Sequence, residues 1–347
     1  MSERTKSNIP FVGLHAHSVA GSLFDALGYP PDHMDFAYEN GCDALALTDH
    51  GNANGLSHQV LHAKKMKEQG RTFKPIFGCE AYFIPSISEW RDEYEKALED
   101  KKRAKSLGSE LSGATVEDEN SSKKVQDVLR RRRHLILLAQ NQTGLQNIFK
   151  LISESYKSEN FYRYPRMDYD LLAKYGEGVI AASACLGGVY AGNFWENREE
   201  GDEAVLNAMR ETTRRMVAIF GDRWYGELQW NNVPEQHKLN QFIIKMHEEF
   251  GIGLISTADS HYPNPDAWKD RELYKRLGWL GKAAPSYEST ELPIDVDEIG
   301  YELYPKNGDQ MWESYKKYSA ECGVEYDDDL VLQSIKHTHE IAHQRIE

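Results

Sequence analysis

Seven short apolar runs recur along the chain, and polar stretches with helical spacing separate most of them. Each run is rich in valine, isoleucine, leucine or tyrosine and is about as long as one strand of a small sheet. Short strands that alternate with helices are typical of β–α–β units and a parallel sheet. The chain of 347 residues is long enough for one large domain, alone or with a small one. The seven runs are residues 11–14, 44–47, 75–77, 135–139, 179–182, 224–228 and 253–256.

The intervening stretches carry apolar residues at helical spacing, and four of them predict helices clearly. Gly70 follows the second and is a suitable residue to end it. Seven β/α units over residues 9–270 fit a closed barrel about as well as an open sheet. The predicted helices are residues 32–40, 56–69, 203–220 and 236–250.

Polar side chains that can bind metals follow the carboxyl ends of several predicted strands. The active site of a β/α barrel is built from the ends of many strands. An open doubly wound sheet places its site at one switch point instead. The distribution of these side chains therefore favours a barrel. They are His15, His17, Asp49, His50, Glu80, Cys185, Asp259 and His261.

Two regions depart from this pattern and define the predicted domain organisation. Residues 1–285 form the barrel, with a densely charged excursion at 86–133. The excursion is either a solvated, partly helical insertion or a basic arm that contacts a phosphate backbone or a partner. Residues 286–347 form an acidic connector and a helical appendage, with helices expected at 308–320 and 330–346.

Composition excludes several classes of protein. The formal net charge is −14, which disfavours non-specific binding to nucleic acid but is compatible with a carboxylate-rich metal site. No apolar run is long enough to span a membrane, and the amino-terminal residues do not resemble a signal peptide. The four cysteines form no CxxC pair, so we expect a reduced, cytoplasmic protein without a disulfide framework.

Each polar motif alone is a weak signal, but together they indicate a metal centre. Imidazole and carboxylate ligands suit zinc, manganese or iron, and a thiolate adds a softer ligand. The set has more ligands than one ion needs, which implies two or three ions that share bridging carboxylates. Such ions, about 3.5–4 Å apart, clamp both oxygens of a phosphoester and activate a water molecule as hydroxide. The sequence contains no nucleotide-binding glycine loop and no GxSxG motif.

Several segments resemble the PHP domain family (polymerase and histidinol phosphatase). The similarity is greatest to the amino-terminal region of the alpha subunit of bacterial C-family replicative DNA polymerases. It covers nearly the whole chain except the charged excursion. The segments that carry it are FVGLHAHSVAGSLFDAL, DALALTDHGNANGL, KPIFGCEAYFIP, HLILLAQNQTGLQNIFKLIS, GVIAASACLGG and GLISTADSHY.

The resemblance implies a distorted (β/α)7 barrel that binds two or three divalent ions (Zn, Mn or Fe). It also implies metal-dependent phosphoester hydrolysis and, as in some family polymerases, 3′→5′ proofreading of DNA. All nine positions that match the family's ligands hold metal-competent side chains, and Glu80 corresponds to the bridging carboxylate. The nine are His15, His17, Asp25, His50, Glu80, His134, Cys185, Asp259 and His261.

These observations predict a DNA exonuclease that acts alone or beside a separate polymerase core. Two alternatives remain open: a non-catalytic docking subunit of a split polymerase, and a small-molecule phosphatase of the histidinol phosphatase type. The chain contains no recognisable polymerase active site, so nucleotide addition is not expected.

Overall fold

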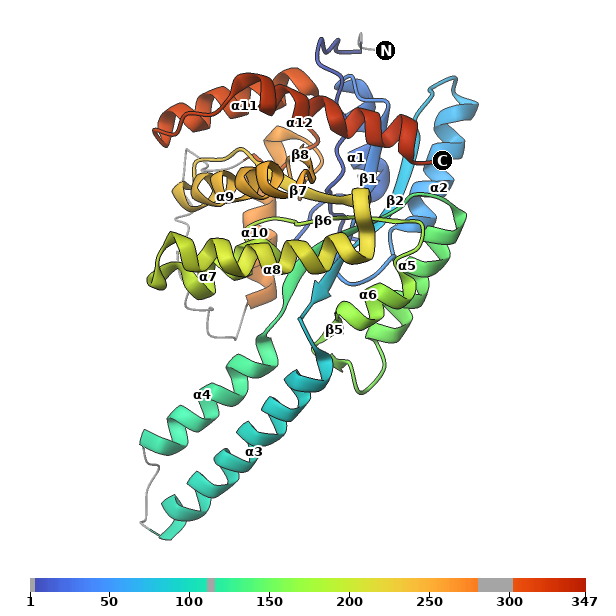
Figure 1. Ribbon diagram of the computed structural model, residues 1–347. Helices are drawn as coiled ribbons and strands as arrows, with labels where there is room; N and C mark the ends of the chain where they lie inside the picture. Colours follow the sequence, from blue (N-terminus) through green and yellow to red (C-terminus); the bar gives the residue numbers. More distant parts are fainter. Residues whose placement is uncertain (1–3, 111–115, 280–301) are drawn as a thin grey trace.

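A single curled sheet forms the centre of the molecule, and helices cover its outer face (Figure 1). The computed structural model describes residues 4–110, 116–279 and 302–347. The predicted acidic connector begins at residue 286, and nearly all of it lies outside these ranges. The strands are β1 (Ala44–Leu47), β2 (Lys74–Phe83), β3 (Arg133–Ala139), β4 (Phe161–Tyr162), β5 (Tyr164–Met167), β6 (Val179–Ala182), β7 (Trp224–Gln229) and β8 (Gly253–Thr257).

Helices follow most strands, and the four helices predicted from apolar spacing are confirmed within two residues at each end. Gly70 adopts a φ of +75° just after the second of these helices, as expected for a residue that ends a helix. The helices are α1 (Pro30–Glu39), α2 (Leu56–Glu68), α3 (Ile87–Glu110), α4 (Val116–Arg130), α5 (Gln142–Ser155), α6 (Tyr169–Tyr175), α7 (Val189–Asn197), α8 (Asp202–Phe220), α9 (Pro234–Phe250), α10 (Trp268–Trp279), α11 (Gly308–Glu321) and α12 (Asp328–Glu340), with short turns of other helix types at Arg198–Glu200, Gly221–Arg223, Pro265–Ala267 and Ile341–Arg345.

The segment 11–17 closes the sheet into a barrel, although it forms no regular strand. On one side, Ala46 N–H in β1 donates to Gly13 O at 2.8 Å. On the other side, His17 N–H donates to Ser260 O, just beyond β8, at 2.7 Å. The wall of the barrel is therefore formed by this extended segment and strands β1, β2, β3, β6, β7 and β8. The predicted distorted (β/α)7 barrel is confirmed.

Among the strands that form the barrel, β3 departs from the expected parallel arrangement, and the short β4 outside it pairs antiparallel with β5. β3 runs antiparallel to both of its neighbours, β2 and β6, whereas the pairs β1–β2, β6–β7 and β7–β8 are parallel. The expectation of an entirely parallel sheet is thus wrong at β3. The reason is the connection: the helical pair α3–α4 leaves the carboxyl end of β2 and returns to the same end, so the chain re-enters the sheet in the opposite direction.

Apolar residues on both faces of the strands explain why the runs are continuous rather than alternating. In β3, Ile136 and Leu138 point into the barrel, while Leu135 and Leu137 pack under the helices. Residues after α12 complete the inner cluster, because the side chains of 341, 342 and 346 are buried with those of the strands. The carboxyl-terminal helices therefore contribute to the barrel core.

The charged excursion folds as two helices, α3 and α4, that project together from the barrel (Figure 1). Trp90 anchors their base: its indole N–H donates to Val128 O at 2.8 Å. The buried guanidinium of Arg166 lies 4.3 Å from the Trp90 ring and donates to the main-chain oxygens of Arg131 and Leu129. Residues 86–133 contain eleven acidic and twelve basic side chains, so the insertion as a whole is not strongly basic.

A buried histidine in α1 makes folding stability depend on pH. The His33 ring is fully buried, and its Nε2 lies 2.9 Å from Leu27 O. Burial lowers the pKa of His33 from 6.5 to about 4, so the unfolded chain binds the proton more tightly. The contribution of the neutral ring is present above pH 6.5 and is lost as the pH falls toward 4.

We expect the unfolding free energy of the wild type to fall between pH 7 and pH 5 by about 2 kcal/mol more than that of the His33→Gln variant. Denaturant unfolding at both pH values measures this difference, and other acid-sensitive groups cancel in the comparison. Equal losses in the two proteins would show that His33 is not the group responsible.

Candidate metal centre

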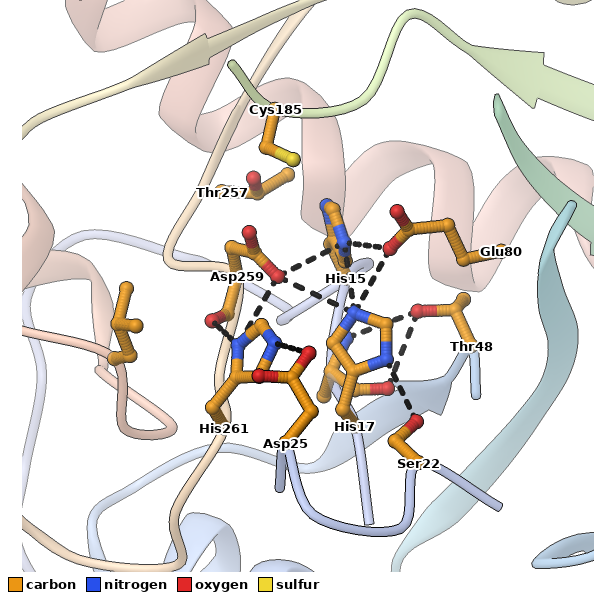
Figure 2. A network of polar contacts seen from close by, with 12 residues as sticks. His15, His17, Ser22, Asp25, Thr48, Glu80, Cys185, Thr257, Asp259 and His261 are labelled. Atoms are coloured by element: carbon orange, nitrogen blue, oxygen red, sulfur yellow. Dashed lines mark hydrogen bonds and ion pairs between the residues drawn. The ribbon is translucent and has the colours of Figure 1, made fainter. Parts of the chain in front are cut away.

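The nine side chains singled out in the sequence all lie at one end of the barrel or in a loop beside it. The extended segment 11–17 supplies His15 and His17, and β2 supplies Glu80 (Figure 2). Other members follow the strands that end there: His50 after β1, Cys185 after β6, and Asp259 and His261 after β8. Asp25 comes from the loop before α1.

His134 lies at the beginning of its strand, and the direction of β3 explains why it nevertheless reaches the site. Because β3 is antiparallel to β2, its first residues lie beside the last residues of β2. His134 is paired with Tyr82, two residues beyond Glu80 and on the same face of the strand. The imidazole Nδ1 contacts Glu80 Oε1 as a result.

Glu80 lies at the centre of the cluster and is fully buried. Its Oε2 lies 2.7 Å from His15 Nε2 and 2.8 Å from His17 Nε2. Its Oε1 lies beside His134 Nδ1 and 3.7 Å from His50 Nδ1. One carboxylate thus touches two groups of imidazoles with its two oxygens, which is the arrangement that a bridging ligand requires.

Two aspartates extend the cluster on the side away from Glu80. Asp259 Oδ1 lies 2.9 Å from His15 Nε2 and 3.4 Å from His261 Nδ1. Asp25 Oδ2 lies 2.9 Å from His50 Nε2 and 3.3 Å from His261 Nε2. Both carboxylates therefore share imidazole neighbours with the centre of the cluster.

Cys185 lies at the edge of the cluster. Its sulfur is 3.7 Å from His134 Nδ1, and Gly187 N–H points to it at 3.5 Å. Burial, together with the carboxylates of Asp259 and Glu80, raises the pKa of the thiol well above its ordinary value. A neighbouring cation would be needed to hold this sulfur as a thiolate.

The donor atoms are arranged as they would be around cations. The three overlapping groups with close donor atoms are His15–His17–Glu80–Asp259, His50–Glu80–His134 and His17–His50–His261. Glu80 Oε1, Asp259 Oδ1 and His50 Nδ1 are buried and make no hydrogen bond, although imidazoles lie beside the two oxygens. The nitrogens His15 Nε2 and His17 Nε2 face each other at 3.1 Å. Buried polar atoms without hydrogen bonds are costly, and divalent ions would satisfy them.

The electrostatics of the cluster are those of strongly coupled opposite charges. Burial opposes the charged form of Glu80 and Asp259, but the surrounding imidazoles outweigh it and hold the pKa of both carboxyls well below the ordinary range. Burial likewise opposes protonation of His17, yet Glu80 and Asp259 raise its pKa to about 9. Without a cation, His17 carries a proton at neutral pH, so metal binding must release it.

Glu227 is a functional residue that reasoning from the sequence missed. It lies in β7, fully buried, and its Oε1 is 2.6 Å from His15 Nδ1. Gln229 and Thr257 donate to the same oxygen. The carboxylate therefore fixes the ring so that Nε2 faces Glu80 and Asp259, as carboxylates behind metal-binding histidines commonly do. The sequence did hint at this role, because Glu227 is the single acidic residue within the apolar run 224–228.

Asp49, which follows β1 directly before His50, has a different role from its neighbour. Its Oδ1 accepts from Ser18 N–H at 2.7 Å and from the Ser22 hydroxyl at 2.9 Å. Its Oδ2 accepts from the Ser18 hydroxyl at 2.8 Å. Both oxygens hold the loop that carries Asp25, so this carboxylate positions the loop and does not join the cluster.

Left-handed backbone conformations gather around the site. Outside glycine, four residues of the described ranges have such a φ, and three of them adjoin or belong to the cluster. They are Phe24 (+63°), before Asp25; Ala184 (+61°), before Cys185; and Asp259 (+49°). Conformations of this kind cost about 1–3 kcal/mol each and concentrate where a site over-determines the backbone.

A pocket of about 310 Å³ opens directly onto the cluster. Asp25, Glu80 and Asp259 contribute to its lining, and two cationic residues of α10, Arg271 and Lys275, lie at the same pocket. Arg271 also donates to Asp25 Oδ1 at 2.7 Å, which ties α10 to the cluster. The arrangement is suited to an anionic ligand, whose charge would meet the two cationic side chains on one side and any metal ions held by the cluster on the other.

Comparison with known proteins identifies the family. A model of the PHP domain matches residues 13–231. The DNA polymerase III subunit alpha of Aquifex aeolicus is 36% identical over 256 residues, which cover 74% of this chain and 18% of that protein. The protein of the same name from Deinococcus radiodurans is 32% identical over 305 residues, which cover 87% of this chain and 19% of that protein.

The chain thus spans about a fifth of the length of these curated relatives. Among solved structures, an amidohydrolase from Chromobacterium violaceum matches with a TM-score of 0.37 and 15% identity, over 76% of this chain and 96% of that one. No helix among the described residues is long and apolar enough to cross a membrane. The resemblance drawn from the sequence motifs is confirmed, and the chain belongs to the PHP domain family.

Proposed function

We propose that the chain is a metal-dependent phosphoesterase whose centre holds two or three divalent ions. The observation that carries this proposal is Glu80, a buried carboxylate with imidazoles against both of its oxygens. The overlapping donor groups around it supply more ligands than one ion takes. The mixture of imidazole and carboxylate is compatible with zinc, manganese and iron.

When bound, such ions act as Lewis acids toward a phosphoryl group and supply a water-derived nucleophile at neutral pH. The residues of the chain divide the remaining tasks. Glu80 and Asp259 compensate the charge of the ions, and His15 is held in orientation by Glu227. Arg271 fixes Asp25 through Oδ1 and leaves Oδ2 toward His50 and His261.

We propose DNA as the substrate, cleaved as a 3′→5′ exonuclease either by the chain alone or beside a polymerase core. The named relatives are alpha subunits of DNA polymerase III, which supports both the substrate and the partner. Next to Asp25, the ring of Phe24 is 43% exposed and stacks on Tyr274 of α10 at 5.4 Å between centroids. An aromatic pair that is partly exposed near the pocket suits stacking on a nucleobase, which p-nitrophenyl phosphate and histidinol phosphate lack.

Lys275 tests the proposed contact with a polymer. Its side chain lines the pocket, and we expect Lys275→Gln to raise KM for a single-stranded oligonucleotide about tenfold with little change in kcat. Lys269→Gln is the matched control, because Lys269 is exposed on the same helix but does not line the pocket. Steady-state kinetics of the three proteins measure the effect. Equal KM values would exclude Lys275 from substrate binding.

The function itself is tested with a DNA strand labelled at its 5′ end, with p-nitrophenyl phosphate as a second substrate, both in the presence of Mn²⁺. A descending ladder from the wild type, absent with Asp259→Ala, supports an intrinsic 3′→5′ exonuclease. Cleavage of the phosphomonoester alone would indicate a small-molecule phosphatase. Inactivity on both substrates despite bound metal, alone and with a polymerase core added, would indicate a docking subunit.

A further inference from the structure

A second group of metal-competent side chains lies outside the centre described above. Asp43, His339 and His343, called here the Asp43 cluster, bring three donor atoms within 4.8 Å of one another. His343 Nε2 is 3.0 Å from Asp43 Oδ1, and His339 Nε2 is 3.7 Å from Asp43 Oδ2. From this arrangement we infer that the Asp43 cluster binds a divalent transition metal ion, with zinc as the best match.

The separations fit the geometry of such an ion. Bonds of 2.0–2.1 Å to imidazole and carboxylate in a tetrahedral arrangement place ligand atoms roughly 3.3 Å apart. The distance from His343 Nε2 to Asp43 Oδ1 is slightly shorter than that value, and the distance from His339 Nε2 to Asp43 Oδ2 is slightly longer, so each imidazole faces a different oxygen of the carboxylate. The two imidazoles come from positions four residues apart and lie on one face, with ring centroids separated by 4.4 Å. Three protein ligands leave the remaining position for water.

The Asp43 cluster lies at the carboxyl end of α12. His339 belongs to the last turn of α12, and His343 belongs to the π-turn Ile341–Arg345 that follows it. The carboxyl end of a helix attracts positive charge. Lys74 already uses the main-chain oxygens of Ala342 and Ile346, so an ion here draws on the three side chains rather than on those oxygens.

The position of the cluster indicates what the ion does. Asp43 directly precedes β1, whereas the centre around Glu80 lies where β1 and its parallel neighbours end. The Asp43 cluster is therefore at the opposite end of the barrel, away from the chemistry. It joins residues 300 positions apart and ties the π-turn, whose buried side chains complete the barrel core, to the first strand. The ion would hold the end of α12 and the turn after it against the start of β1.

Equilibrium dialysis of the metal-free protein against Zn²⁺, followed by elemental analysis, tests the inference. We expect the wild type to bind one more Zn²⁺ per chain than His343→Ala, while His58→Ala, an exposed histidine of α2, matches the wild type. The central site contributes equally to all three proteins. The thermal midpoint gained by adding Zn²⁺ should also be smaller in His343→Ala.

Asp43→Asn provides a second variant that keeps the shape of the side chain, and circular dichroism checks that each protein is folded. Loss of one Zn²⁺ in both folded variants, with unchanged hydrolysis, supports a structural metal ion at the Asp43 cluster. Identical Zn²⁺ content in the wild type and in either folded variant would overturn it.

Discussion

Glu80→Gln is expected to remove bound metal and to reduce phosphoester hydrolysis by at least about 100-fold. Loss of a residue that only supports a metal ligand costs up to about 100-fold, and Glu80 is proposed as a ligand itself. The amide has nearly the same shape as the carboxylate but has lost its negative charge. It also places a donor beside His15, His17 or His134, where an acceptor now lies. Both oxygens are used, so neither orientation of the amide can restore the contacts.

Metal content by elemental analysis and hydrolysis under saturating Mn²⁺ measure this effect together. Glu248→Gln, an exposed carboxylate in α9, is the control for loss of one negative charge. A Glu80→Gln protein that retains its full metal content and activity would show that the bridging carboxylate lies elsewhere.

The second large effect is expected from Glu227, which touches no proposed ion. Its Oε1 lies 2.6 Å from His15 Nδ1, and burial strengthens the field that it exerts on the ring. Glu227→Gln makes His15 a weaker and less well-oriented ligand, and we expect a 10–100-fold lower metal affinity. Activity should recover at high metal concentration, in contrast to Glu80→Gln.

Metal titration of the metal-free protein provides the measurement for Glu227. Thr257→Val is the matched control, because it removes a donor to the same Oε1 but leaves the carboxylate charged. We expect it to have the smaller effect. If Glu227→Gln and Thr257→Val weaken binding equally, packing rather than charge is the cause.

Much of the barrel could be predicted because its strands are buried on both faces. Runs such as 135–139 and 179–182 are apolar throughout, and few other structures accommodate them in alternation with amphipathic helices. The direction of β3 was not predictable from apolar patterns, because a run has the same composition in either direction. The run 11–14 was predicted as a strand, but the segment 11–17 forms isolated bridges to its neighbours rather than a regular strand.

Some residues of the candidate site could likewise be predicted from the sequence, and others could not. His15, His17, Glu80 and Asp259 were visible because polar residues interrupt or end apolar runs. His134 rested on the family resemblance alone, since its place near Glu80 follows from the antiparallel strand. Glu227, and the cluster formed with Asp43 across 300 residues, depend on contacts between distant segments that no local pattern records.

Anomalous X-ray scattering from crystals of the chain soaked in Mn²⁺ would show whether Glu80 bridges metal ions. An anomalous difference map from data collected close to the manganese absorption edge shows the position of each ion. We expect at least two peaks that share Glu80, one of them among His15, His17 and Asp259. A folded protein with no peak at Glu80 would contradict this expectation.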